Sequence, residues 1–379
     1  MRDPVASLLV AVSRLSPDVE PGLARVDWDR VIEAAEHHAV APLLTRRLAA
    51  LPEGAPPYVL ARLSARFDAN ALRNVALSQE LAELLGRLAL HGVSAMPIKG
   101  PTLALCAYGD LALREFGDLD IVVRPSDLDH ARALLDGWGY QPLARLSPTG
   151  ERALRASDHH VPLVHERSKL MVELHWSLDN GRPGRYLDAD WVWKNARTVS
   201  LLGRDVPSLS WSALLVYLCV HGAKHGFSRL GWLRDIAGVL AAAPEGELAA
   251  AAELASEVDA RRRLALGVRL AREFLGAPAR RDVEPVELPD WDALERDVHA
   301  LLFGAGGTGL ASWIAFQCAT FDKLRDRAGY WFHTLAAPHV ADVEALTLPR
   351  WLAGAYYVFR PARLAAREAR ALFGVRPAR

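Results

Sequence analysis

The sequence of 379 residues has few of the features that assign a protein to a class directly. Its three cysteines, Cys106, Cys219 and Cys318, are far apart and form no CxxC pair. This spacing excludes a disulfide framework and a cysteine-type zinc site, and it favours a reducing compartment. No run approaches 18 apolar residues, and Asp3 interrupts the apolar pattern near the N-terminus. We therefore expect no membrane insertion and no signal peptide, and we predict a cytoplasmic protein.

The chain also lacks an excess of charge of either sign. Lys and Arg together number 45, as do Asp and Glu, so the formal net charge is zero. Nucleic-acid binders usually carry a basic excess, so nucleic acid is the least favoured partner. The hydrophobic content of 51% is ordinary for a globular protein with sizeable cores.

The spacing of apolar residues changes twice along the chain and predicts three regions. Residues 1–90 form an N-terminal helical region, because their apolar positions recur at helical spacing. Residues 91–200 mix strand and helix patterns, and residues 201–379 are again helical. Glycine and proline are frequent in residues 181–210, which we interpret as a connection. The predicted fold class is α+β, a small mixed-sheet core flanked by helical regions.

Within the core, the pattern predicts individual elements. Residues 93–98 and 116–123 are expected strands, with a helix over 102–108 between them. A further helix is expected after Ser126, which we take as its N-cap. Residues 161–178 predict a hairpin of two strands.

Two acidic residues in the second strand are the most informative feature. Asp118 and Asp120 are spaced i, i+2, so they share one face of the strand, where they repel each other unless a cation neutralises them. Lys99-Gly100 ends an apolar strand just before Pro101, and helix N-termini bind phosphate through free N–H groups. A pair of solvated acids at a strand edge is the alternative. We favour a divalent-metal site beside a phosphate-binding turn, as nucleotidyl transfer requires.

A third acid is predicted in the hairpin. Glu173 and His175 alternate with the apolar Val172 and Leu174, so both project to one side of the strand. Since charged residues are rarely buried without a partner, we expect Glu173 to join the aspartate pair at a cleft, with His175 beside it. A surface glutamate on an edge strand is the alternative.

The helix that follows Ser210 carries histidines at i, i+4. His221 and His225 could bind zinc, but the segment HGAKH lacks the glutamate of HExxH helices. A hydrogen-bonded pair packed between domains is another alternative. We predict that both histidines and Lys224 face the cleft and hold triphosphate or acceptor. Arg229 and Asp235 follow at helical spacing as further cleft residues, and Asp235 is expected to orient a histidine or an arginine.

Several pieces of the chain match one known superfamily. They are Ile98-Lys99-Gly100, Tyr108, Arg114, Gly117 to Val123, Gly139-Tyr140 and Glu173-Leu174-His175-Trp176. In these pieces the chain resembles the polymerase-β-type nucleotidyltransferases, and more narrowly a bacterial branch of uncharacterised nucleotidyltransferases. The resemblance is strong over residues 90–180. One departure is the phosphate turn, which is usually Gly-Ser and closer to the first aspartate.

The resemblance implies a reaction and a set of roles. Asp118, Asp120 and Glu173 would hold two Mg²⁺ ions, with Mn²⁺ as an alternative, and would act as the catalytic residues. The substrate would be an NTP, expected to be ATP, whose NMP passes to a hydroxyl of a small molecule or of a peptide or protein. The expected nucleotide-binding residues are Lys99, Gly100, Thr102, Arg114 and Lys224, with the Thr102 hydroxyl in place of the missing serine.

Two rival hypotheses remain at this point. The altered phosphate turn is compatible with a catalytically silent nucleotidyltransferase-fold binding module. A histidine-dependent metalloenzyme centred on His221 and His225 is the other.

Overall fold

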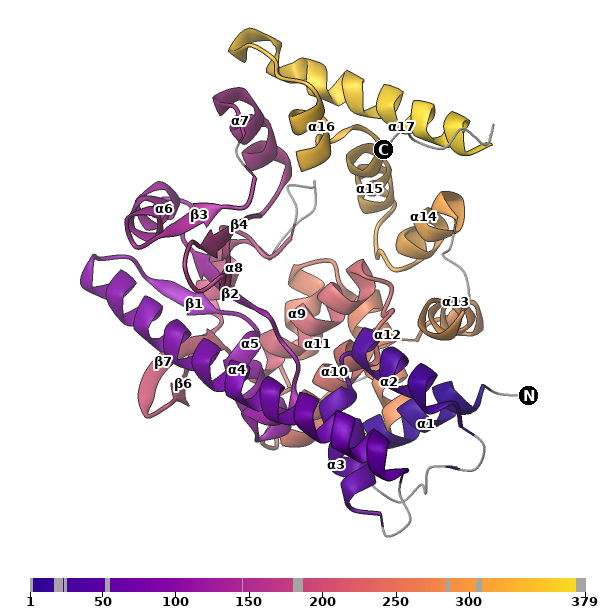
Figure 1. Ribbon diagram of the computed structural model, residues 1–379. Helices are drawn as coiled ribbons and strands as arrows, with labels where there is room; N and C mark the ends of the chain where they lie inside the picture. The colour runs from indigo at the N-terminus through magenta and orange to yellow at the C-terminus, as the bar shows by residue number, and fades with distance from the viewer. Residues whose placement is uncertain are drawn as a thin grey trace.

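The structure is a computed structural model that describes residues 3–16, 23, 26–51, 55–144, 146–179, 187–283, 287–304 and 309–372. A five-stranded mixed sheet lies beside helices contributed by both ends of the chain (Figure 1). The predicted α+β class, with a small mixed sheet between helical regions, is confirmed.

The N-terminal part is helical, as predicted. It comprises α1 (Pro4–Ser13), α2 (Trp28–His37), α3 (Ala41–Ala49) and the long α4 (Pro57–Leu90). Helix α4 buries Leu77, Leu81, Leu84 and Leu88 in the same apolar cluster as the central strands. This spacing of three and four residues forms one continuous stripe, so α4 packs along the sheet over several turns.

The sheet has the order β1-β2-β5-β4-β3. Its strands are β1 (Ala95–Pro97), β2 (Asp118–Val123), β3 (Tyr140–Pro142), β4 (His160–His165) and β5 (Met171–His175). Strands β2 and β5 are parallel, whereas the other pairs are antiparallel, including the predicted hairpin of β4 and β5. In the parallel pair Asp120 lies opposite Glu173, so the two predicted acidic positions are direct neighbours.

Short helices connect these strands. They are α5 (Gly100–Tyr108), the 3-10 helix η1 (Leu111–Leu113), α6 (Leu128–Gly137) and α7 (Pro148–Ser157). The N-cap of α6 is Asp127 and not Ser126 as predicted. The Ser126 hydroxyl donates to Asp127 Oδ1 at 3.0 Å, so it does not bond a backbone N–H of the helix.

The interpretation of residues 181–210 as a connection is wrong for its described part, while residues 180–186 lie outside the described residues. This part contains α8 (Ala189–Lys194) and a hairpin of β6 (Ala196–Leu201) and β7 (Arg204–Leu209). Leu202 and Gly203, with φ of 51° and 75°, form its tight turn. Positive φ at both positions matches the twist of the strands, so here glycine marks a hairpin.

The C-terminal part is helical, as predicted. Its first helices are α9 (Trp211–Lys224), α10 (Leu230–Ala242), α11 (Ala251–Glu257) and α12 (Arg261–Leu275), which share one large apolar core with α1 to α3. The remaining elements are α13 (Trp291–Phe303), α14 (Leu310–Ala319), α15 (Leu324–Ala336), α16 (Val340–Ala345), the 3-10 helix η2 (Arg350–Ala355) and α17 (Tyr356–Leu372). In the part of the chain that the structure describes, no helix is both long and apolar enough to cross a membrane.

Candidate active site

A cavity of about 420 Å³ lies between the sheet and helices α5, α9 and α10. It brings together twelve of the thirteen residues that the sequence predicts for the site. They are Lys99, Gly100, Arg114, Asp118, Asp120, Glu173, His175, His221, Lys224, His225, Arg229 and Asp235. The thirteenth, Thr102, is buried outside the cavity lining.

The acidic residues come from the parallel strands β2 and β5. Asp118 and Asp120 alternate with the buried Leu119 and Ile121, so the strand turns both acids toward the cavity. Asp120 is only 4% exposed. Burial, together with the negative charge of Asp120, raises the pKa of Asp118. A cation in the cavity would therefore stabilise the charged form of one of the two carboxylates.

Asp120 already has two basic neighbours. Lys99 Nζ lies 3.2 Å from Asp120 Oδ2, and His175 Nε2 lies 3.1 Å from Asp120 Oδ1. Burial opposes ionisation of Asp120, but Lys99 and the hydrogen bond with His175 hold its pKa well below the ordinary value. The same pairing with Asp120 overcomes burial and raises the pKa of Lys99. At neutral pH this is a buried, charged pair.

Glu173 continues this network along β5. Its Oε2 lies 3.4 Å from His175 Nε2 and 3.7 Å from His160 Nε2. Burial raises the pKa of Glu173, but the hydrogen bond with His175 outweighs that effect, so the pKa is lowered and the carboxylate is ionised. His175 is disfavoured as a cation by burial, yet Asp120 and Glu173 raise its pKa.

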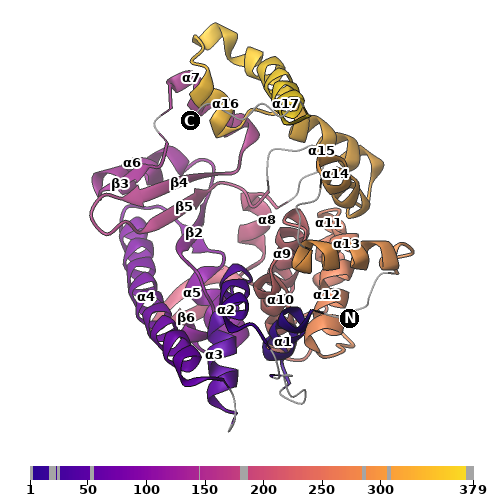
Figure 2. The same cartoon turned by 45° about the vertical axis from the view of Figure 1, so that its right-hand side comes forward.

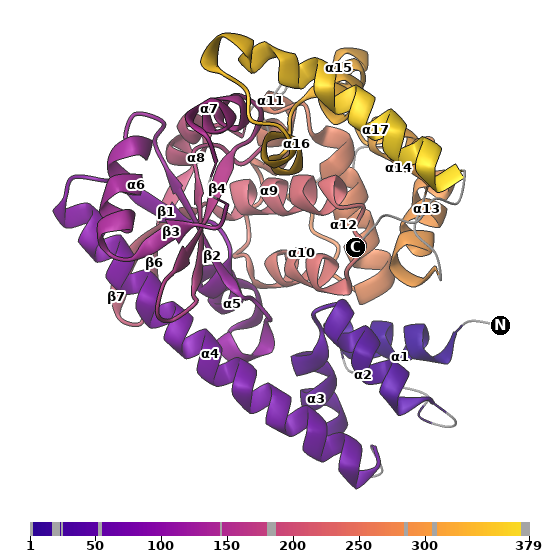
Figure 3. The same cartoon turned by 45° about the horizontal axis from the view of Figure 1, so that its top comes forward.

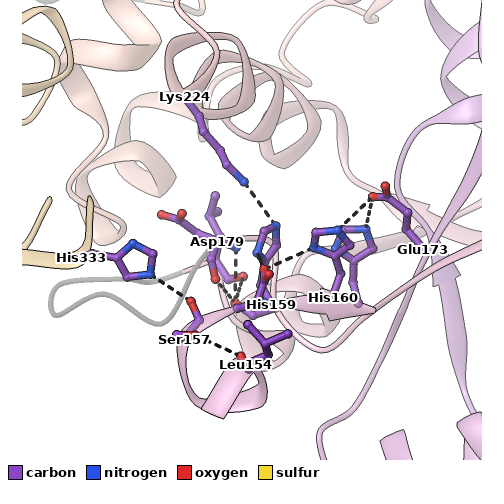
Figure 4. A network of polar contacts seen from close by, with 12 residues as sticks. Leu154, Ser157, His159, His160, Glu173, Asp179, Lys224 and His333 are labelled. Carbon is purple, nitrogen blue, oxygen red and sulfur yellow. Dashed lines mark hydrogen bonds and ion pairs between the residues drawn. The ribbon is translucent and has the colours of Figure 1, made fainter. Parts of the chain in front are cut away.

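Histidines at the start of β4 connect the acids to helix α9. Figure 4 shows His160 beside Glu173 and the side chain of Lys224 reaching down to His159. The distance between Lys224 Nζ and His159 Nε2 is 3.3 Å. Burial and the charge of Lys224 lower the pKa of His159 to about 3, so this imidazole is neutral and accepts from Lys224.

The predicted phosphate turn forms the N-terminus of α5. Gly100 has φ of +56°, a left-handed conformation that only glycine adopts without strain. Lys99 is the N-cap and its side chain makes no capping hydrogen bond; helix N-termini carry backbone N–H groups that can bind an anion. The Thr102 hydroxyl instead donates to the Lys99 carbonyl at 3.0 Å and stabilises the turn.

Arg114 is held by helix α10. Its guanidinium donates two hydrogen bonds to Asp235, at 2.9 and 3.0 Å. The Tyr108 hydroxyl donates to the same carboxylate at 2.8 Å. Asp235 therefore orients an arginine, one of its two expected partners, and this buried cluster fixes α10 against the loop that precedes β2.

His221 and His225 form a wall of the cavity with Trp232. The two imidazole centroids are 4.7 Å apart, and the Trp232 ring lies 5.6 Å from His221 and 5.1 Å from His225. Burial, followed by neighbouring cations, lowers the pKa of both rings, that of His225 to about 4. Both are therefore neutral at pH 7 and offer hydrogen bonds without charge.

The described residues contain two groups with the proximity that a metal ion needs. One is Asp120, Glu173 and His175, and the other is His159, His160 and His175; within each group the ligand atoms lie within 4.8 Å of one another. Among the described residues, neither Asp118 nor the pair of His221 and His225 belongs to such a group.

Sequence reasoning did not assign several side chains of this cavity to the site, among them His159, His160 and Tyr217. Isolated histidines are usually structural, and Tyr217 belongs to an apolar helical stripe. The one available signal was the acidic and basic triplet Asp158-His159-His160 directly before an apolar strand, because polar residues at strand ends often line sites.

The carboxylates of the adjacent strands β2 and β5 line the same cavity as the glycine turn at the N-terminus of α5. The chain belongs to the family of uncharacterised nucleotidyltransferases, which matches residues 24–276, and it is an enzyme of that class. No curated protein sequence matches the chain.

Three solved structures show partial similarity. The antibiotic-resistance factor ANT(2'')-Ia is 11% identical, over 60% of this chain and 98% of its own, with a TM-score of 0.32. An antigenic nucleotidyltransferase-like protein from Paracoccidioides brasiliensis is 17% identical, over 54% and 94%, with a TM-score of 0.35. A tRNA-processing enzyme is 15% identical, over 77% and 79%, with a TM-score of 0.25. Such scores fall short of a shared global fold, and the family membership depends on the sequence match.

Proposed function

We propose that this protein transfers an NMP from an NTP to a hydroxyl group of a small molecule or of a peptide or protein. ATP is the nucleotide that we expect. The observation that carries the proposal is the placement of Asp118, Asp120 and Glu173 on neighbouring strands, facing the open N-terminus of α5 across one cavity. Phosphate oxygens and metal-binding carboxylates must meet in this way for phosphoryl chemistry.

The residues present fit a divalent cation. Asp120, Glu173 and His175 each offer one ligand atom within 4.8 Å of the others, and carboxylate oxygens suit Mg²⁺ and Mn²⁺. Asp118 lines the same cavity, and burial together with the charge of Asp120 raises its pKa, an effect that a bound cation would oppose. These residues would hold the two Mg²⁺ ions that the family resemblance implies. A bound divalent ion supplies neutralisation of the triphosphate and polarisation of the α-phosphoryl group.

The chain's own residues account for the other steps. The first turn of α5, beginning at Gly100, and the Lys99 ammonium bind phosphate oxygens and orient the α-phosphorus. Glu173, ionised at neutral pH, accepts the proton of the acceptor hydroxyl. The hydroxyl oxygen then forms a bond to the α-phosphorus as the bond to the β-phosphate oxygen breaks, and pyrophosphate leaves. His221, His225 and Lys224 hold the triphosphate or the acceptor from the opposite wall.

Nucleotide binding tests this proposal directly. Calorimetric titration with ATP, with and without Mg²⁺, compares the wild type with the double variant Asp118→Ala/Asp120→Ala. We expect the wild type to bind ATP only with the metal, and the ATP affinity of the double variant to be lower by at least about tenfold, or about 1.4 kcal/mol. The matched control is Asp68→Ala, because Asp68 is an exposed acid on α4, away from the cavity.

Two outcomes would separate the alternatives. Equal binding by the wild type and the double variant, or binding by neither, would refute the proposed site. Metal-dependent binding without transfer to any acceptor would favour the silent binding module, for which the buried Lys99–Asp120 pair is the supporting observation.

A further inference from the structure

Lys224 and His159 come from opposite sides of the cavity and meet in one contact. Lys224 is the last residue of α9, which belongs to the helical core, and His159 directly precedes strand β4 of the sheet. Lys224 Nζ lies 3.3 Å from His159 Nε2, and both residues line the cavity with the acids and Gly100. A lysine side chain has many rotamers, so an ammonium that is already held in place loses less conformational freedom when it binds a phosphate.

Helix α14 holds the end of α9 that carries Lys224. Gln317 is only 1% exposed, and its side-chain amide donates to the carbonyl oxygens of Ala223 at 2.8 Å and of Lys224 at 3.2 Å. The last carbonyl groups of a helix lack partners within the helix, so Gln317 caps α9 from a distant segment. Packing adds to this hold, because a Cβ atom at Gly226 would lie 2.8 Å from the Trp313 ring. Figure 3 shows α9 between the sheet and α14.

Helix α15 holds the other partner of the contact. His333 is buried, and its Nε2 lies 2.9 Å from the Ser157 carbonyl oxygen. A carbonyl oxygen only accepts, so the imidazole donates this hydrogen bond. Ser157 ends α7, and the carboxylate of the next residue, Asp158, accepts from the backbone N–H of His159 at 2.8 Å. Figure 4 shows this succession from His333 through Ser157 to His159 and Lys224.

Helices α14 and α15 are themselves joined. The Trp313 indole of α14 donates to the Tyr330 hydroxyl of α15 at 2.9 Å, and Figure 2 shows the two helices as neighbours. The contacts therefore form a closed ring, which runs from Lys224 to His159, on through α15 and α14, and back to the end of α9. Each partner of the contact across the cavity is thus fixed from outside the cavity.

We propose that Gln317 and His333 are positioning residues that hold the Lys224 ammonium at its place in the cavity wall. Neither of the two lines the cavity, so they act through Lys224. Both lie beyond residues 24–276, which match the family, so the C-terminal helices supply this support. The effect expected on nucleotide binding rests on the proposed function, with Lys224 on the triphosphate, whereas the positioning itself does not depend on it.

Labelling of lysine amines tests the positioning without any nucleotide. The full chain is treated briefly with acetic anhydride, and mass spectrometry gives the labelling rate of Lys224 relative to that of the exposed Lys169. An ammonium that is held in a contact reacts slowly. We therefore expect this ratio to rise about two- to tenfold in Gln317→Leu and in His333→Phe, the range that the loss of one hydrogen bond gives. His333→Phe carries the test if Gln317→Leu does not fold, and circular dichroism checks each variant.

The matched control is Ser212→Ala. The buried Ser212 hydroxyl lies in the first turn of α9 and donates to the Glu247 carbonyl at 2.8 Å. This variant therefore also loses a buried hydrogen bond of α9, but at the end of the helix that is remote from Lys224. Its labelling ratio and its ATP affinity should equal those of the wild type.

A double-mutant cycle on ATP affinity tests whether Gln317 acts through Lys224. In calorimetric titration with ATP and Mg²⁺, we expect Gln317→Leu to weaken binding about two- to tenfold, because the ammonium must then be ordered on binding. In the background of Lys224→Met the same change should have no further effect, because the ammonium that Gln317 positions is gone. A merely structural role would weaken binding by the same factor in both backgrounds.

Two results would overturn the proposal. One is a Lys224 labelling ratio that stays at the wild-type value in both Gln317→Leu and His333→Phe. The other is an equal loss of ATP affinity from Gln317→Leu with and without Lys224. If the wild type binds no ATP, the proposed function fails, and the labelling ratios alone decide the positioning.

Discussion

Replacing Lys99 with methionine removes the buried ammonium from Asp120 and keeps a side chain of similar length. The contact between Lys99 Nζ and Asp120 Oδ2 is 3.2 Å, and the two side chains are 17% and 3% exposed. Deleting one partner of such a pair leaves a buried charge and typically costs about 3 to 5 kcal/mol. Because His175 remains 3.1 Å from Asp120, we expect the lower figure, about 3 kcal/mol of unfolding free energy.

The assay is urea unfolding followed by circular dichroism at pH 7.5, with chelator and then with Mg²⁺ or Mn²⁺. With a slope of about 3 kcal/mol/M, the midpoint of Lys99→Met should fall by about 1 M in chelator. A divalent ion should restore most of this loss, because it replaces the missing positive charge and no longer competes with the ammonium. We therefore expect the metal to stabilise the variant more than the wild type.

The matched control is Lys194→Met, which removes a surface pair with Glu257 whose side chains are 67% and 38% exposed. This substitution should change the unfolding free energy by no more than about 1 kcal/mol, with or without the metal. The double variant Lys99→Met/Asp120→Asn should regain stability, since the unpaired charge is gone. Equal stability of Lys99→Met and the wild type, or equal stabilisation of both by metal, would refute the reasoning.

Three further predictions concern residues around the cavity. Asp235→Asn leaves the Arg114 guanidinium without its buried anion and should lower the unfolding free energy by about 3 kcal/mol in urea titration; a loss below about 1 kcal/mol would contradict the assigned role. Burial lowers the pKa of His38 to about 4, so its stabilising contribution is complete above pH 6.5 and is lost as the pH falls toward 4. Between pH 7 and 5 the unfolding free energy of the wild type should therefore fall by about 2 kcal/mol more than that of His38→Gln. Parallel plots of unfolding free energy against pH for the two proteins would exclude this titration. Gly100→Ala strains a residue at φ +56° and should lower the unfolding free energy by about 1 kcal/mol and also weaken ATP binding. Gly137→Ala, in helix α6 with open space around it, should change neither the stability nor the ATP affinity.

The placement of the acids could be predicted because it depends on a local regularity. Side chains alternate along a strand, so Asp118 and Asp120 share a face wherever the strand lies. The same alternation separates Glu173 and His175 from the buried Leu174. The prediction that one cleft collects these residues needed only the assumption that apolar faces turn inward.

Contacts between distant segments could not be predicted in the same way. The pairing of Lys99 with Asp120 depends on the antiparallel register of β1 and β2. The pairing of Lys224 with His159 joins helix α9 to the residue just before β4, 65 positions away. No local pattern specifies such partners. The exposed Leu324 and Phe332 of α15 are a related case, because periodicity locates an apolar stripe but does not tell whether the fold buries it.

In the function that we propose, Asp118, Asp120 and Glu173 support the transfer of an NMP from an NTP to the acceptor. The most direct measurement incubates the protein and Mg²⁺ with a cell extract and ATP labelled either at the α- or at the γ-phosphate. We predict that only the α-label enters an acceptor, with release of pyrophosphate, and that Glu173→Gln and Asp118→Ala/Asp120→Ala abolish the incorporation. Incorporation of the γ-label, or unchanged incorporation of the α-label by these variants, would contradict the claim.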